Sequence, residues 1–242
     1  MSQGYASTVL GYTALGLRKY WSGVHEALRK RRWEAERERR ISAYRERYAV
    51  RKLHMGAGPS RLTGWLDTDL APCLDSIMYL DVREPFPFAD SSFRYVFSEH
   101  LIEHLTYAEG QHMLKECRRV LEPDGTLRVA TPNLLRLLEL FEPSLPQSGQ
   151  RYIDWTLSRY HLPTCSSPPC FVLNNFMRAW GHKFVYDPVT LKAAVESVGF
   201  TKTDFVAPGE SDDTELRGVE FHGREIGEEY NLFETMVCEA RA

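Results

Sequence analysis

The sequence has 242 residues, of which 26% are charged and 43% are hydrophobic, and its formal net charge is −3. This length suits one α/β domain with additions, and the charge balance gives no reason to expect a nucleic-acid partner. No apolar run approaches the ~20 residues that a membrane helix needs, and the N-terminus has no signal-peptide pattern. The five cysteines are odd in number and scattered, which favours reduced thiols in a cytoplasmic protein.

Residues 1–48 are expected to form an N-terminal helical extension in front of a main domain over residues 49–242. Apolar residues recur at helical spacing from about residue 17 to 48, and Glu36 and Arg40 form a favourable i,i+4 pair. One interpretation is a solvated helix that packs one face on the domain. The other is a surface through which residues 17–48 dock a partner or a second copy of the chain in a homodimer.

The main domain opens with a short apolar strand over residues 51–55, followed by Gly56, Ala57 and Gly58. Glycine reaches positive φ without strain and lets a ligand approach the backbone closely. A second strand then ends near Asp69, whose carboxylate can accept hydrogen bonds from a ribose. Since ligands of doubly wound sheets bind at the carboxyl ends of the strands, this layout predicts a nucleoside-type cofactor site.

The short connection between these two strands limits the choice of cofactor. Residues 59–65 leave no room for the helix whose N-terminus faces the pyrophosphate in dinucleotide folds, and the third glycine of that motif is missing. A nicotinamide oxidoreductase is therefore disfavoured, and a cofactor without a pyrophosphate fits better.

Strands and helices continue along the rest of the chain. The patterns predict strands over residues 76–81, 93–98, 126–131, 200–207 and 231–240, and helices over residues 106–121, 133–141 and 187–199. Thr106 and Glu109 match a capping box, and Asp187 followed by Pro188 matches a helix start. Residues 142–186 lack strand character, and because so long a connection is usually functional or mobile, we expect a lid there.

Four motifs occur in an order that is typical of one enzyme family. They are the glycine turn Leu53–Pro59, the loop Asp81–Phe93, the Glu-His-x-x-Glu-His segment within Ser98–Leu105, and the run Arg119–Pro132. With these motifs the chain resembles class I S-adenosylmethionine-dependent methyltransferases of the type 11 kind, above all a bacterial subgroup associated with glycan or natural-product gene clusters. The resemblance covers residues 50–207 and says nothing about the N-terminal extension.

The resemblance implies an α/β fold with a Rossmann-like, mostly parallel sheet of seven strands, whose last strand is antiparallel and inserted between the fifth and the sixth. It also implies S-adenosyl-L-methionine as the cofactor. The residues that would contact this cofactor are Gly56, Ala57, Gly58, Asp69, Asp81, Val82, Ser98, Glu99 and His100. The match at Asp81 is loose, since the family's adenine-contacting acid can align one residue later, at Val82.

No metal site is expected from the sequence. The string His100-x-x-Glu103-His104 matches a zinc-peptidase motif, but it lies at a strand-to-helix junction instead of inside a long helix. A second set of residues matches no compact zinc spacing: His161, Cys165, Cys170 and His182.

The expected reaction is methyl transfer to a hydroxyl or an amine of a small-molecule or glycan-type acceptor. A hydroxyl must lose its proton, and histidine is suited to this at neutral pH, so the candidate bases are His100, His182 and His161. An amine acceptor would need no base. The lid is expected to contact the acceptor through His161, Trp180, His182 and Tyr186. The alternative is a catalytically silent methyltransferase fold that docks a partner through residues 17–48.

Overall fold

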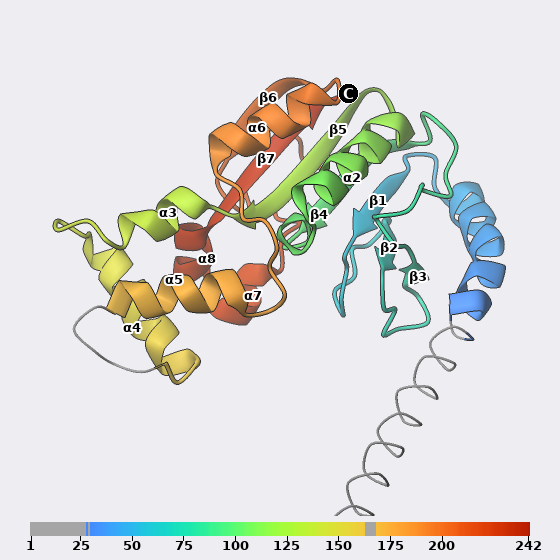
Figure 1. The fold of residues 1–242 in the computed structure, drawn as a ribbon. Helices are drawn as coiled ribbons and strands as arrows, with labels where there is room; N and C mark the ends of the chain where they lie inside the picture. Colours follow the sequence, from blue (N-terminus) through green and yellow to red (C-terminus); the bar gives the residue numbers. More distant parts are fainter. Residues whose placement is uncertain (1–27, 29, 163–167) are drawn as a thin grey trace, which may run out of the picture. The chain divides into compact units, whose positions relative to one another are not determined.

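The computed structural model describes residues 28, 30–162 and 168–242 (Figure 1). The chain divides into two compact units, Met1–Arg47 and Tyr48–Ala242. In the first unit residues 30–47 are helical, and Glu36 accepts hydrogen bonds from Arg32 at 3.2 Å and from Arg40 at 3.3 Å. The helix expected over residues 17–27 lies outside the described residues, and the docking role of this extension stays a prediction.

The second unit is built on a seven-stranded sheet in the order β3-β2-β1-β4-β5-β7-β6. The strands are β1 (Lys52–Met55), β2 (Leu66–Asp69), β3 (Met78–Tyr79), β4 (Phe93–Glu99), β5 (Leu121–Pro132), β6 (Thr201–Val206) and β7 (Thr235–Arg241). β7 pairs antiparallel with β5 on one side and with β6 on the other, and the first five strands pair in parallel. The expected fold class, with its last strand reversed and inserted, is confirmed.

The helices lie on one face and at one end of this sheet (Figure 1). They are η1 (Ile102–His104), α2 (Tyr107–Val120), α3 (Leu134–Glu139), α4 (Gln147–Arg159), α5 (Pro168–Arg178), α6 (Pro188–Ser197), α7 (His222–Ile226) and α8 (Glu228–Glu234). α2 and α6 lie side by side on one face of the sheet, where Gln111 Nε2 of α2 donates a hydrogen bond to the Ala194 carbonyl of α6 at 3.3 Å. None of the helices in the described part of the chain has the length and apolar character that a bilayer span requires.

Two predicted helix starts are confirmed by their capping contacts. Thr106 and Glu109 form the capping box of α2, with Thr106 N–H donating to Glu109 Oε2 at 2.7 Å and Glu109 N–H donating to Thr106 Oγ1 at 3.3 Å. Asp187 caps α6, since its Oδ1 accepts the N–H of Val189 at 2.9 Å and that of Thr190 at 3.1 Å. Pro188, the first residue of α6, gives up no helical hydrogen bond at this position.

The structure corrects the boundaries of three predicted segments. The third strand is only Met78–Tyr79, because it lies at the edge of the sheet and pairs with β2 alone. The last strand begins at Thr235, and residues 231–234 belong to α8, whose acidic first turn suits a helix N-terminus. The insertion over residues 142–186, which showed no strand character, folds into α4 and α5 in its described part.

Candidate functional site

The glycine turn follows β1 at the edge of the sheet where the parallel strands end. Gly56 has φ of +70° and Gly58 has φ of +54°, so both occupy the left-handed region that favours glycine. A side chain at Gly58 would meet no atom within 4 Å, which leaves open space beside the turn. At Gly56 a Cβ would lie 3.2 Å from the Leu101 side chain, so this turn directly contacts the segment after β4.

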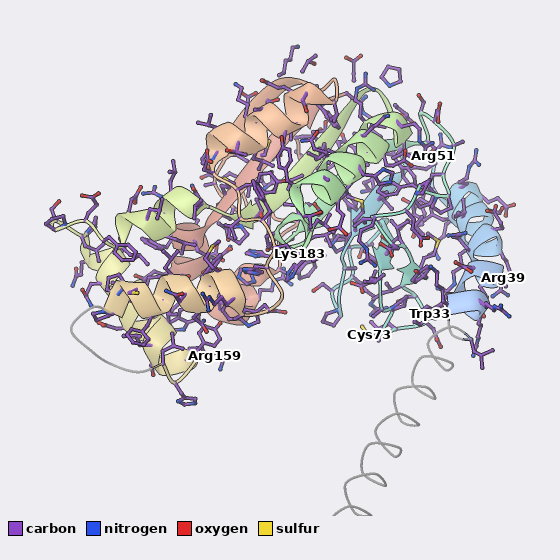
Figure 2. The ribbon with its side chains drawn as sticks, viewed as in Figure 1. Trp33, Arg39, Arg51, Cys73, Arg159 and Lys183 are labelled. Carbon is purple, nitrogen blue, oxygen red and sulfur yellow. The ribbon has the colours of Figure 1, made fainter. Side chains whose placement is uncertain are left out.

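Asp69 ends β2 and holds the glycine turn through its side chain. Its Oδ2 accepts the N–H of Gly58 at 2.9 Å, and its Oδ1 accepts the N–H of Ala71 at 2.7 Å. Cys73, which Figure 2 labels in the loop after β2, donates its thiol to the Gly58 carbonyl at 3.2 Å. Each oxygen of the half-buried Asp69 carboxylate has a second acceptor site, so a ribose diol fits at this position.

Ser98 and Glu99 end β4, which lies directly beside β1. Ser98 is completely buried, and its Oγ has no hydrogen-bond partner among the described residues. An unpaired buried hydroxyl next to the glycine turn fits a bound ligand that supplies the missing partner. Glu99 instead uses both carboxylate oxygens to accept the N–H groups of Phe221 and His222, at 2.8 and 3.0 Å.

Asp81 and Val82 follow β3, and both are buried. The Asp81 carboxylate accepts two hydrogen bonds from the Arg83 guanidinium, at 2.8 and 2.7 Å, and one from the Arg83 backbone N–H at 3.0 Å. The carboxylate expected near the adenine is thus held by the next arginine, which fixes the loop after β3.

A cavity of about 400 Å³ begins at His100, the residue directly after β4. One part of its wall is aromatic, with Tyr152, Trp155, Tyr160, Phe176 and Trp180. Arg159, which Figure 2 labels on α4, also lines it. The rest of the wall carries imidazoles and carboxylates from the residue after β4, η1, the segment before α6, α7 and α8: His100, Glu103, His104, His182, His222 and Glu234. The cavity therefore combines flat apolar surfaces with groups that can bind hydroxyls and move protons.

His100 is held on both ring nitrogens and has φ of +46°, which is uncommon outside glycine. Its Nδ1 lies 3.0 Å from Oε1 of the fully buried Glu103, and its Nε2 lies 3.2 Å from Thr235 Oγ1. Burial alone would lower the pKa of His100, but the close contact with Glu103 and the charges of Glu234 and Glu99 outweigh it and raise the pKa. For Glu103, burial alone would raise the pKa, but the contact with His100 outweighs it and lowers the pKa.

His182 is a histidine of the cavity whose pKa is lowered. Its Nδ1 lies 2.8 Å from the Phe176 carbonyl, which only accepts, so Nδ1 carries the proton and Nε2 keeps its lone pair. Burial lowers the pKa of His182, and the neighbouring His104, whose ring centroid lies 5.0 Å away, acts in the same direction. His182 thus has the form that a proton acceptor needs at neutral pH.

Three residues expected at the acceptor have different positions. Trp180 lines the cavity and is half exposed. His161 is exposed and does not line it. Tyr186 does not line it either, because its ring is buried between Tyr107 and Phe184 and its hydroxyl faces Gly110.

His222 and Glu234 were not predicted from the sequence, because His222 lies in a polar segment without periodicity and Glu234 was expected inside the last strand. The ring centroids of His100 and His222 are 3.8 Å apart, and His222 Nε2 lies 2.9 Å from Glu234 Oε1. Glu234 Oε2 accepts a hydrogen bond from the hydroxyl of Tyr152. Only the fold brings this set together, and no signal in the sequence of residues 208–234 points to it.

An edge of parallel strands that carries a glycine turn and a carboxylate at a strand end has the layout of a cofactor site in nucleoside-binding α/β domains. Residues 53–129 match the model of the family described as a methyltransferase domain. The chain thus carries a class I methyltransferase domain, and S-adenosylmethionine is the cofactor of that domain. No curated protein matches the chain.

Several solved structures are similar to the chain at low identity. A SAM-dependent methyltransferase from Archaeoglobus fulgidus is 17% identical, with 85% of this chain and 91% of that chain covered and a TM-score of 0.49. An S-adenosylmethionine-dependent methyltransferase from Mesorhizobium loti is 15% identical, with 83% of this chain and 96% of that chain covered and a TM-score of 0.47. A possible histamine N-methyltransferase from Thermotoga maritima is 13% identical, with 87% of this chain and 96% of that chain covered and a TM-score of 0.44.

Proposed function

We propose that the chain transfers the methyl group of S-adenosylmethionine to a hydroxyl of a small, glycan-type acceptor in the cavity that begins at His100. The observation that carries this proposal is the composition of the cavity wall, which combines aromatic faces with imidazole and carboxylate groups. Aromatic rings bind the apolar face of a sugar ring, and the polar groups bind its hydroxyls.

The cofactor supplies a methyl group on a positively charged sulfur, which leaves as a neutral thioether. The chain's residues then have two tasks, to align the acceptor and to take its proton. The turn at Gly56 and Gly58, together with Asp69, is the proposed cofactor contact. The contact between Gly56 and Leu101 supports a position next to the cavity, because Leu101 directly follows the cavity residue His100.

His182 is the proposed general base of the three histidines considered. Its Nε2 has no hydrogen bond to any residue that the structure describes, and its Nδ1 is fixed by the Phe176 carbonyl. His100 is less suited, since both of its nitrogens already have partners and its pKa is raised. His161 lies outside the cavity wall.

Turnover tests the proposal directly. The purified protein is incubated with S-adenosylmethionine and a panel of simple glycosides, phenols and amines, and S-adenosylhomocysteine is quantified. We expect turnover with hydroxyl acceptors. Turnover with amines alone would contradict the proposed hydroxyl chemistry. Cofactor binding without turnover on any acceptor would favour a catalytically silent fold.

The base is tested with two matched histidine variants. His182→Ala is expected to lower kcat for hydroxyl acceptors by roughly 10²–10⁴-fold, the usual contribution of a general base. His161→Ala removes a histidine that does not line the cavity and is expected to keep the wild-type rate. Cofactor affinity should stay unchanged in both variants. A wild-type rate in His182→Ala would remove His182 from the mechanism.

A further inference from the structure

Three side chains of the cavity wall form a possible ligand set for a metal ion. His100, His222 and Glu234 each offer one ligand atom, and these atoms all lie within 4.8 Å of one another. They come from three separate elements, since His100 follows β4, His222 begins α7 and Glu234 ends α8. The set therefore depends on the tertiary fold, and the short zinc motifs considered in the sequence would not reveal it.

The distances within the set suit adjacent ligands of one ion. His222 Nε2 lies 2.9 Å from Glu234 Oε1. Two ligand atoms at about 2.1 Å from an ion lie about 3.0 Å apart at right angles and about 3.4 Å apart at the tetrahedral angle of zinc, so the pair is at or slightly inside ligand spacing. The imidazole rings of His100 and His222 lie close together, with centroids 3.8 Å apart, and their ligand atoms lie within 4.8 Å of each other.

Each ligand is oriented by a further contact, as in natural metal sites. The Nδ1 of His100 lies 3.0 Å from Glu103, so Nε2 is the ligand atom, and it would exchange its contact with Thr235 Oγ1 at 3.2 Å for the ion. The hydroxyl of Tyr152 donates to the second oxygen of Glu234. Glu99 accepts the backbone N–H of His222 at 3.0 Å and so fixes the start of α7. A carboxylate behind a ligating histidine and a hydrogen bond to a ligating carboxylate are typical of such sites.

We propose that His100, His222 and Glu234 bind a divalent transition-metal ion whose remaining coordination positions face the acceptor cavity. Two imidazoles and one carboxylate favour zinc, iron or a similar ion over magnesium or calcium, which prefer oxygen ligands. This inference departs from the sequence-based expectation of no metal. It does not depend on methyl transfer, because it concerns binding alone.

A second set in the same wall, formed by Glu103, His104 and His182, also has its ligand atoms within 4.8 Å. We favour the first set because Glu103 lies behind one of its ligands, with Oε1 3.0 Å from the Nδ1 of His100. The other carboxylate oxygen of Glu103, Oε2, accepts a hydrogen bond from Thr131 at 3.1 Å. Glu103 is thus better placed to orient His100 than to bind the ion itself.

Metal binding by the untagged full-length protein tests the site. The protein is treated with a chelator, dialysed against Zn²⁺ or Co²⁺, and analysed for metal content, with the visible absorption of Co²⁺ as a second readout. We expect one ion per chain, with no displacement by excess Mg²⁺. His222→Ala and Glu234→Gln should abolish stoichiometric binding, and Tyr152→Phe should weaken it roughly 10-fold.

His182→Ala is the matched control, since it removes a histidine of the same cavity wall that belongs only to the second set. It is expected to keep the ion. Absence of stoichiometric metal in the wild type would overturn the proposal, and so would loss of the ion in His182→Ala with retention in His222→Ala. Near-UV circular dichroism and the melting temperature verify folding, and His222→Gln replaces His222→Ala if the latter does not fold.

Discussion

Asp69 accepts the backbone N–H of Gly58 at 2.9 Å, so one carboxylate shapes the glycine turn and is also the proposed ribose contact. Its second oxygen accepts the N–H of Ala71 at 2.7 Å. Both bonds lie at the ends of parallel strands, where this class of fold binds its ligands. Loss of the Asp69 carboxylate therefore has a structural and a functional effect, and an experiment has to separate them.

Asp69→Ala is expected to lower the free energy of unfolding by about 1–2 kcal/mol and to weaken S-adenosylmethionine binding at least 10-fold. Asp187→Ala is the matched control, because Asp187 also accepts two backbone N–H groups but caps α6. Calorimetry gives the cofactor Kd, and urea unfolding gives the stability. Equal loss of affinity in both variants would show that Asp69 acts only through the fold.

Gly58→Ala is expected to weaken cofactor binding more than it lowers stability. An alanine at φ of +54° costs about 1–2 kcal/mol, and its methyl group would occupy the open space beside the turn. Gly218→Ala is the control, since Gly218 has φ of +69° and equally open surroundings in a different loop. The two variants should have similar melting temperatures and different values of Kd. Unchanged affinity in Gly58→Ala would exclude a close approach of the cofactor to this turn.

The pH dependence of kcat reports on His182. Burial is the largest effect and lowers its pKa below the ordinary value of 6.5. The charge of Glu103 raises this pKa, whereas His104 and His100 lower it. The neutral base is therefore present at pH 7, and kcat for a hydroxyl acceptor should stay flat from pH 8 to 7 and fall only below about pH 6.5. An acid limb that begins above pH 7 would contradict this assignment.

Glu116 makes the stability of the domain sensitive to acid. Its carboxylate is hydrogen-bonded by Arg119 at 2.9 and 2.7 Å and by the Phe86 N–H at 2.6 Å, and these contacts lower its pKa in spite of burial. Because the pKa of Glu116 is lower in the folded than in the unfolded state, its ionised carboxylate adds stability at pH values above the unfolded-state pKa of 4.5. This contribution is lost as the pH falls through the folded-state pKa.

Glu116→Gln should lower the free energy of unfolding by about 1–3 kcal/mol at pH 7 and should narrow the gap to the wild type as the pH falls towards 3. Urea unfolding at several pH values measures this gap. Glu122→Gln is the control, because Glu122 pairs with Arg51 at 3.4 Å in a more exposed position. A constant gap between Glu116→Gln and the wild type would contradict the linkage.

Local signals in the sequence predicted much of the fold. The capping box at Thr106, the Asp187-Pro188 helix start and the glycine turn depend on neighbouring residues, and the structure has the two helix starts and the turn where they were expected. The place of the last strand, antiparallel between the fifth and the sixth, followed from the family resemblance and is confirmed. Short-range patterns were sufficient for these features because the physical cause is itself local.

The cavity wall was only partly predictable. His100 and His182 were identified, but His222 lies far along the chain in a polar segment without periodicity, and Glu234 was expected in the last strand instead of a helix at the cavity. Their position depends on long-range contacts, such as the hydrogen bond from the His222 N–H to Glu99. Tyr186 was expected to contact the acceptor, but the fold buries this residue of the lid segment in the core.

The reactivity of the Cys73 thiol can report whether a ligand occupies the glycine turn. Cys73 is exposed and bonded to the Gly58 carbonyl, whereas Cys117 and Cys238 are buried, and burial raises the pKa of Cys238 to about 12. If Cys165 and Cys170 are replaced by serine, Cys73 is the one exposed cysteine left among those that the structure describes. Its rate of alkylation would then follow occupancy of the turn in solution, without a coupled assay or knowledge of the acceptor.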